Sequence, residues 1–179
     1  MNDILQGINV YLVGMMGSGK TTVGQELARH LGYRFFDTDT LIERVAEKTV
    51  SEIFATEGEV NFRQLEHQVL CELAAYQHSV IATGGGIVIR TENWSYLRCG
   101  LVVWLDAPVE TLFDRLRGDS TRPLLDDRDP LAKLEAILAA RRSKYEQADL
   151  HVLFQDGESP AQIAQRIFND IPTVLKSRV

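Results

Sequence analysis

The sequence predicts an α/β fold of three layers, in which helices cover both faces of a central five-stranded parallel sheet. Short apolar runs alternate with helical segments along the chain, which is the pattern of a parallel sheet covered by helices. The first apolar run is followed directly by a glycine-rich segment that opens a helix. A length of 179 residues suits one compact domain, so we expect residues 1–179 to form a single unit.

The five expected strands are short apolar runs. The first and the fourth are continuous in their hydrophobicity, which indicates that they are buried. The third stops at a run of glycines, and the second runs into an aspartate. The expected strands span residues 9–13, 34–36, 80–82, 101–105 and 151–154.

The helix after the first strand has clear ends. Residues 20–31 place their apolar side chains on one face, and Gly32 follows, a residue favoured just after helix C-termini. Pro108 is expected in the first turn of a later helix, where its missing N–H costs no hydrogen bond. The other helices are expected over residues 39–46, 50–55, 59–76, 108–116, 130–148 and 160–168.

Residues 118–129 interrupt this alternation. They have neither a helical nor an alternating period, and they are dense in charge. Long irregular segments of compact domains are commonly active-site loops. We therefore expect a mobile lid over about residues 117–129.

The composition argues against several classes of protein. The net charge of −6 argues against nucleic-acid binding, because the phosphate backbone requires a dense basic surface. The chain has no apolar run of about 18 residues and no signal-peptide pattern, so we expect no membrane contact and a cytoplasmic location. Its two cysteines and four histidines lack metal-ligand spacing, and no zinc site is expected.

Residues 14–21 read Gly-Met-Met-Gly-Ser-Gly-Lys-Thr and match the phosphate-binding pattern G-x-x-x-x-G-K-[ST]. The glycines let the loop wrap round phosphates so that backbone N–H groups point inward. Lys20 reaches the β- and γ-phosphates, the Thr21 hydroxyl binds Mg²⁺, and the helix adds its positive N-terminal end. The sequence therefore predicts ATP binding, with Mg²⁺ as cofactor, by Gly17, Ser18, Gly19, Lys20, Thr21 and Thr22.

A phosphate-binding loop does not by itself distinguish a kinase from a GTPase or a motor ATPase. The chain has neither the Asn-Lys-x-Asp segment nor the Asp-x-x-Gly switch of guanine-specific GTPases. It is also too short for most motor ATPases. A kinase that phosphorylates a small molecule is the class that remains.

Asp37 and Asp39 follow the second strand, at the carboxyl edge of the sheet where α/β proteins bind ligands. In an extended chain they would point to opposite sides, so that one orients Mg²⁺ and the other accepts a proton from an attacking hydroxyl. The alternative is an N-cap of the next helix, formed by Thr38 or Asp39. Asp106, after the fourth strand, also has two interpretations, a Mg²⁺ acid or a residue near a helix N-cap.

Glycines and arginines complete the candidates. The three glycines at 84–86 end the third strand and permit a ligand to approach backbone N–H groups closely, although a plain flexible turn is the alternative. Arg63 and Glu66, one helical turn apart, indicate a surface ion pair. Arg122 lies in the expected lid, where a mobile arginine can close over the transferring phosphoryl group. Of Arg141 and Arg142, one is expected to face the site and one the solvent.

Together these motifs resemble those of the shikimate kinase family, in the nucleoside-monophosphate-kinase-like group of P-loop proteins. The resemblance covers about residues 9–168, which is nearly the whole chain. Its markers beyond the phosphate-binding loop are Asp-Thr-Asp at 37–39, Ile-Phe-Ala-Thr-Glu-Gly-Glu at 53–59, Phe-Arg-Gln-Leu-Glu at 62–66, the three glycines, Thr-Arg-Pro-Leu-Leu at 121–125 and Arg-x-x-x-Tyr at 141–145.

The resemblance implies transfer of the γ-phosphoryl group of ATP to the 3-hydroxyl of shikimate, a step of chorismate and aromatic amino-acid biosynthesis. It implies a substrate-binding region over about residues 38–63, in which Arg63 becomes a carboxylate clamp steadied by Glu66. The implied catalytic residues are Lys20, Asp39 and Arg122, and the implied shikimate-binding residues are Asp39, Arg63, Gly84, Gly85, Gly86 and Arg141. By the same resemblance, Arg115 stacks on adenine, Arg122 also contacts ATP, and Thr21 and Asp37 attend Mg²⁺.

Two other functions stay open at this point. One is a kinase for another small polyol acid such as gluconate, and the other is a non-catalytic kinase-like interaction module. The expected partners are ATP and shikimate, without nucleic acid or membrane, and the chain is expected to be a monomer.

Overall fold

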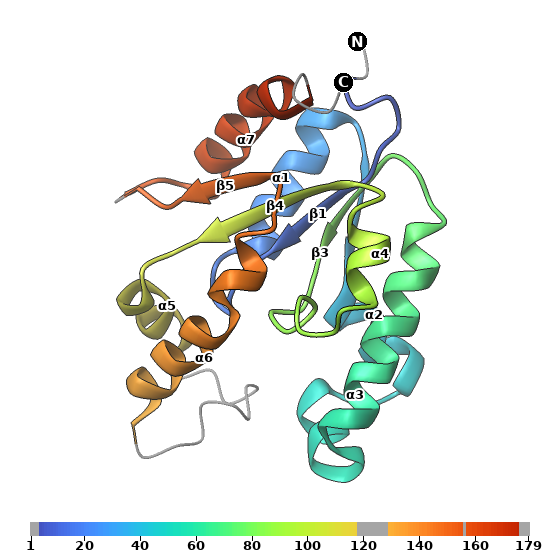
Figure 1. Cartoon of the computed structure of the whole chain (residues 1–179), viewed down its shortest axis with the longest axis vertical. Helices are drawn as coiled ribbons and strands as arrows, with labels where there is room; N and C mark the ends of the chain where they lie inside the picture. Colours follow the sequence, from blue (N-terminus) through green and yellow to red (C-terminus); the bar gives the residue numbers. More distant parts are fainter. Residues whose placement is uncertain (1–3, 118–128, 156, 176–179) are drawn as a thin grey trace.

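The computed structural model describes residues 4–117, 129–155 and 157–175 (Figure 1). The expected lid therefore lies almost entirely outside the described residues. Within the described ranges, none of the helices combines the length and the apolar character that crossing a bilayer requires.

A five-stranded parallel sheet forms the centre of the molecule, in the order β2-β3-β1-β4-β5. The predicted fold class is thus confirmed, and each strand lies within one residue of its expected ends. The strands are β1 (Val10–Val13), β2 (Arg34–Asp37), β3 (Ser79–Ala82), β4 (Leu101–Asp106) and β5 (Leu150–Leu153).

Helices cover both faces of the sheet, because alternate residues of each buried strand point to opposite sides. Val10 and Leu12 of β1 pack against α1 (Lys20–Leu31) and α7 (Pro160–Leu175). Tyr11 and Val13 point the other way, into a second core shared with the remaining helices. These are α2 (Thr38–Ala46), α3 (Val50–Ala74), α4 (Asn93–Leu97), α5 (Val109–Leu116) and α6 (Pro130–Tyr145).

Several helix boundaries differ from the expectation. The segments expected at 50–55 and 59–76 are joined in α3, with a kink at Gly58, whose φ of 79° and ψ of 171° are not helical. Pro108 is the N-cap residue of α5 and lies before its first turn. The short helix α4 was not expected at all, α6 ends at Tyr145, and α7 continues past residue 168 to Leu175.

The carboxyl ends of the parallel strands meet at one edge of the sheet. The glycine-rich loop follows β1, Asp37 ends β2, and the three glycines begin two residues after β3. Segments far apart in the sequence are thereby brought together, as expected for ligand sites in α/β folds.

Candidate active site

The loop between β1 and α1 leaves the helix N-terminus open to an anion. Gly19 is the N-cap of α1 with a φ of 85°, in the left-handed region that glycine adopts without strain. No side chain caps this end, and the first turn contains no acidic residue. The first N–H groups of an α-helix lack intrahelical partners and carry partial positive charge. A phosphate group is therefore a suitable partner for them.

Lys20 lies inside this loop and is buried. Its ammonium donates to the carbonyl oxygens of Gly14 and Met15, both over 2.8 Å, and lies 3.4 Å from Oγ of Ser18. These contacts hold the positive charge at the centre of the loop, where a phosphate group bound by the backbone would meet it.

Asp37 connects the phosphate-binding loop to α2. Its Oδ2 accepts a hydrogen bond of 2.7 Å from Oγ1 of Thr21. Its Oδ1 accepts from the backbone N–H groups of Asp39 at 3.0 Å and Thr40 at 3.3 Å, which makes Asp37 the N-cap of α2. The interpretation that Thr38 or Asp39 forms the cap was wrong. Asp39 belongs to the first turn of the helix and not to an extended segment, and both carboxylates line the same cavity.

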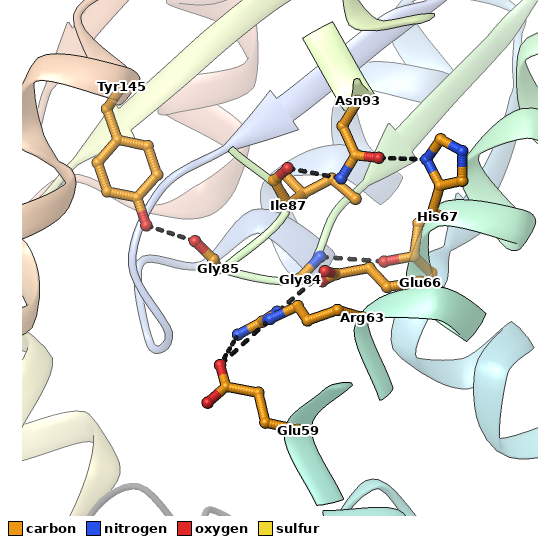
Figure 2. Close-up of polar contacts among 10 residues, drawn as sticks. Glu59, Arg63, Glu66, His67, Gly84, Gly85, Ile87, Asn93 and Tyr145 are labelled. Atoms are coloured by element: carbon orange, nitrogen blue, oxygen red, sulfur yellow. Dashed lines mark hydrogen bonds and ion pairs between the residues drawn. The ribbon is translucent and has the colours of Figure 1, made fainter. Parts of the chain in front are cut away.

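Arg63 and Glu66 form a buried pair on α3, and the prediction of a surface ion pair was wrong. Nη1 of Arg63 donates to Oε2 of Glu66 over 2.9 Å, and the Glu66 side chain is completely buried. On the other side, Nε and Nη2 of Arg63 donate to Oε1 of Glu59 (Figure 2). Two carboxylates thus fix the plane of the guanidinium.

Gly84 and Gly86 are required by close approach of side chains from α2 and α3. A Cβ at Gly84 would lie 2.7 Å from Oε1 of Glu66 and 3.1 Å from Oδ1 of Asp39. A Cβ at Gly86 would overlap the guanidinium of Arg63. The interpretation of a plain flexible turn is therefore wrong, because side chains from two helices occupy the space that a Cβ would need.

Residues of α6 approach the same glycines from the opposite side. Arg141 is buried, and its Nη1 lies 3.6 Å from the position of a Cβ at Gly85. The hydroxyl of Tyr145 donates to the carbonyl oxygen of Gly85 over 2.6 Å (Figure 2). Arg142 is half-exposed and points to Asp106, so one of the two neighbouring arginines faces the glycines, as expected.

Burial and charge shift two pKa values in this cluster. Burial raises the pKa of Glu66 above its usual value, and the nearby Asp39 adds to the rise, although Arg63 opposes it. For Arg63, burial lowers the pKa, but Glu66 and Glu59 outweigh it and hold the pKa above its usual value. Arg63 is therefore a permanent cation beside a carboxyl group that ionises reluctantly.

A cavity of about 650 Å³ connects the phosphate-binding loop with Gly84 and Gly85, whereas Gly86, Arg63 and Arg141 are not among its lining residues. Lys20, Thr21, Asp37, Asp39 and Gly84 all line it. The ammonium of Lys20 and the carboxylate of Asp39 on α2 therefore face the same cavity. Its other walls are Gly17, Gly19, Thr22, Val23, Thr40, Glu43, Thr83, Gly85, Arg115, Phe154, Glu158, Pro160 and Ile163.

Part of this wall was missed by the sequence analysis. Phe154 and Pro160 lie beyond the phosphate-binding loop, and the guanidinium of Arg115 lies over the ring of Phe154 at 4.9 Å. Nη1 of Arg115 also donates to the carbonyl oxygen of Gly17 over 3.1 Å. The aromatic residue after β5 was the available signal, since it follows a strand at the ligand-binding edge of the sheet.

Asp106 does not have the structural role that the sequence suggested, because it does not help to cap the next helix. No side chain caps α5, and Asp106 instead ends β4 with its carboxylate buried. Its Oδ2 lies 2.9 Å from Nε2 of His151 and 3.7 Å from Nη1 of Arg142. Arg122, expected to act from the lid, lies outside the described residues.

Comparisons with known proteins agree on one family. The family model described as shikimate kinase matches residues 16–172. A shikimate kinase of Nostoc punctiforme is 54% identical over 98% of this chain and 97% of its own length, and one of Microcystis aeruginosa is 55% identical over 96% and 90%. A structure of shikimate kinase from Acinetobacter baumannii in complex with shikimate is similar with a TM-score of 0.88 and 41% identity, covering 95% of this chain and 96% of the other.

Proposed function

The chain belongs to the shikimate kinase family, and we propose that the cavity between the phosphate-binding loop and the glycines 84 and 85 is where it transfers the phosphoryl group from ATP to shikimate. The activity itself is that of an ATP-dependent kinase with an alcohol acceptor, which phosphorylates the 3-hydroxyl of shikimate. One observation carries the assignment of the site. Lys20 and Asp39, the expected donor-side cation and acceptor-side carboxylate, line the same cavity.

On the donor side, the N–H groups of the phosphate-binding loop and the first turn of α1 bind the phosphates. Lys20 neutralises charge that develops on the transferring phosphoryl group. The cavity continues past the loop to Arg115, Phe154 and Pro160, and this part of it accepts the adenine base. The guanidinium of Arg115 already lies over an aromatic ring, which supports stacking on a second planar group.

Thr21 and Asp37 fit the requirements of Mg²⁺. Their oxygens lie 2.7 Å apart beside the phosphate-binding loop, and Mg²⁺ takes oxygen ligands, commonly one or two from the protein with the rest from phosphates and water. Among residues 4–117, 129–155 and 157–175, no group of three or more His, Cys, Asp or Glu is arranged to hold a metal ion, so phosphate oxygens must complete the coordination. When bound there, the cation neutralises the β- and γ-phosphate oxygens.

On the acceptor side, Asp39 accepts a hydrogen bond from the attacking hydroxyl and takes its proton as the new P–O bond forms. Arg63 and Arg141 bind the carboxylate of shikimate, because a guanidinium pairs with a carboxylate bidentately. Gly84, Gly85 and Gly86 let the acceptor approach the backbone. These roles are supported by the packing of the buried Arg141 and the partly buried Arg63 against the glycines, and by the position of Asp39 beside Gly84.

The remaining expectations complete the proposal. Residues of about 117–129 act as a lid that brings Arg122 over the phosphates and excludes water during transfer. The enzyme acts as a cytoplasmic monomer. Both cysteines are free thiols, as is usual in a reducing compartment. Light scattering of the purified protein measures the oligomeric state.

The test is an ADP-release assay with a panel of acceptors that includes shikimate and gluconate. ADP release is expected to rise strongly with shikimate and to stay at the basal rate with gluconate. Asp39→Asn is the matched control, because the amide keeps the shape of the carboxylate but cannot take the proton. It is expected to bind ATP and shikimate without turnover. A folded, ATP-binding protein whose ADP release ignores shikimate would contradict the proposal.

A further inference from the structure

The glycine loop at 84–86 is held by hydrogen bonds from two sides. The N–H of Gly84 donates to Oγ1 of Thr38 over 3.0 Å, and the carbonyl of Gly84 accepts from the N–H of Ile87 over 3.1 Å. The first glycine N–H is therefore already used, and it is not available to a ligand. Thr38 is completely buried and lies between Asp37 and Asp39, so this bond connects the loop to the acceptor-side carboxylate.

A hydrogen bond from Tyr145 fixes the direction of the peptide group between Gly85 and Gly86. The hydroxyl of Tyr145 donates to the carbonyl oxygen of Gly85 over 2.6 Å (Figure 2). In a trans peptide, the carbonyl of one residue and the N–H of the next point in opposite directions, and the described residues contain no cis peptide bond. By holding the Gly85 carbonyl, Tyr145 therefore aims the N–H of Gly86. The Ile87 bond to the Gly84 carbonyl aims the N–H of Gly85 in the same way.

These two N–H groups are the ones left for a ligand. In the part of the chain that the structure describes, no carbonyl or side-chain oxygen accepts from the N–H of Gly85 or Gly86, whereas the Gly84 N–H and all three glycine carbonyls are bonded within the protein. The carbonyl groups of the loop are thus bonded to the protein, and the N–H groups of Gly85 and Gly86 are available as donors. Such paired N–H groups bind carboxylate or hydroxyl oxygens well.

We propose that Thr38 and Tyr145 are positioning residues for acceptor binding, which act by holding the Gly84–Gly86 loop so that the Gly85 and Gly86 N–H groups face shikimate. This inference rests on the proposed function. Neither side chain needs to touch the acceptor. Their roles differ from that of Asp39 and of the two arginines, which bind the acceptor directly in the proposed function.

The surroundings of Tyr145 suit a permanent donor. Its side chain is completely buried, and its ring stacks on Trp104 with centroids 5.7 Å apart. Burial raises the pKa of its hydroxyl above the usual value, although Arg141 opposes the rise, so the hydroxyl stays protonated at neutral pH. The ring contact fixes the side chain independently of the hydroxyl. Phenylalanine at this position therefore keeps the ring contact and removes the hydroxyl, both from the Gly85 carbonyl and from the neighbouring Arg141.

The far end of the loop is supported separately. Nδ2 of Asn93 donates to the carbonyl of Ile87 over 2.8 Å, and Oδ1 of Asn93 lies 2.6 Å from Nδ1 of His67 (Figure 2). Because the amide nitrogen is already committed to Ile87, Oδ1 accepts and Nδ1 of His67 carries the proton. This support keeps the loop in place when the Tyr145 bond is lost. The effect of removing the hydroxyl is then confined to the direction of the glycine peptides and to the neighbouring Arg141, whose contact the Thr38 variants leave intact.

The experiment compares Tyr145→Phe with Tyr33→Phe in the ADP-release assay. Tyr33 is the matched control, since its hydroxyl also bonds a backbone group, accepting from the N–H of Gly7 over 3.2 Å, at a place remote from the glycines. Tyr145→Phe is expected to raise KM for shikimate by roughly 5- to 10-fold, the effect of one neutral hydrogen bond, with KM for ATP unchanged. Tyr33→Phe is expected to change neither KM.

The second part of the experiment compares Thr38→Val with Thr38→Ser in the same assay. Valine keeps the shape but removes the acceptor of the Gly84 N–H, whereas serine keeps it. Valine is expected to raise KM for shikimate, and serine to restore it. A purely structural role would instead lower the melting temperature and the active fraction, and hence kcat, with both KM values unchanged. That result, or equal rises in both KM values, would overturn the inference, whereas a wild-type protein without shikimate-dependent turnover would contradict the proposed function itself.

Discussion

Nη1 of Arg63 donates to Oε2 of Glu66 over 2.9 Å, and this pair is packed against two glycines that have no room for a Cβ. Glu66 is completely buried while Arg63 keeps 16% of its side chain exposed. The arginine thus presents an edge to the site while the glutamate holds it from behind. A guanidinium fixed in this way loses little further freedom when it binds a carboxylate.

Replacement of Arg63 by alanine should weaken shikimate binding. We expect KM for shikimate to rise about 10- to 100-fold, from the roughly 1.5–3 kcal/mol of a hydrogen bond to a charged group. KM for ATP should change little. Because the variant leaves Glu66 buried without its cation, Arg63→Ala with Glu66→Gln is the control for lost stability. An unchanged KM for shikimate in either variant would refute the carboxylate role of Arg63.

The raised pKa of Glu66 predicts how pH affects stability. Below the unfolded-state pKa of about 4.5, Glu66 is protonated in both the folded and the unfolded state, so its titration does not lower the free energy of unfolding. As pH rises above that value, the unfolded chain releases its proton first, so unfolding becomes more favourable until the folded group also ionises. Glu66→Gln removes this titration. Its free energy of unfolding in urea denaturation, relative to that of the wild type, should therefore increase as pH rises above about 4.5. A pH-independent difference would contradict the raised pKa.

Some of this site was accessible from the sequence and some was not. The phosphate-binding loop and α1 were predicted to the residue, because Gly19 and Gly32 mark both helix ends and both adopt left-handed conformations. The sequence offered Thr38 or Asp39 as the cap of α2, whereas the structure shows that Asp37 forms it. The same carboxylate also accepts from the Thr21 hydroxyl, which lies sixteen positions away along the chain and which no local pattern reports.

The burial of Arg63 and Glu66 could not be predicted from the sequence either. Arg63 and Glu66 have the spacing of an exposed pair, and only the packing of α3 against the glycines makes them interior residues. The contact between Tyr145 and Gly85 joins residues 60 positions apart, which no local pattern can report. The helix α4 was missed because five residues are too few to show a helical period.

Thr21 and Asp37 predict the Mg²⁺ dependence of the reaction. Thr21→Val removes the hydroxyl that lies beside the carboxylate, while Thr21→Ser keeps it. We expect the Mg²⁺ concentration for half-maximal activity to rise roughly 10-fold in the valine variant, a typical effect of losing one ligand-orienting group, and to stay near the wild-type value in the serine variant. Titration of activity with MgCl₂ at saturating ATP and shikimate measures it. Identical curves for the two variants would rule out the hydroxyl as a ligand.

Lys20 predicts a large loss of turnover without loss of the fold. Methionine has a similar length but cannot donate to the loop carbonyls or neutralise a phosphate. We expect kcat of Lys20→Met to fall at least about 100-fold, as when one charge-stabilising donor is removed from an active site. Circular dichroism should show an unchanged helix content, since only one side chain of α1 is altered. Turnover close to that of the wild type in a folded Lys20→Met protein would exclude the proposed donor site.

Gly86 provides a test of how the glycines and Arg63 act together. A methyl group at Gly86 would overlap the guanidinium, which must then shift or break its bond to Glu66. We expect Gly86→Ala to raise KM for shikimate about 10-fold, and the same substitution to have little further effect once Arg63 is alanine, because nothing remains for the methyl group to displace. The double-mutant cycle of Gly86→Ala and Arg63→Ala in the ADP-release assay measures this coupling. Fully additive losses would mean that the glycine is required by the acceptor itself, whereas a coupling close to the whole Gly86→Ala effect would show that it is required by the arginine.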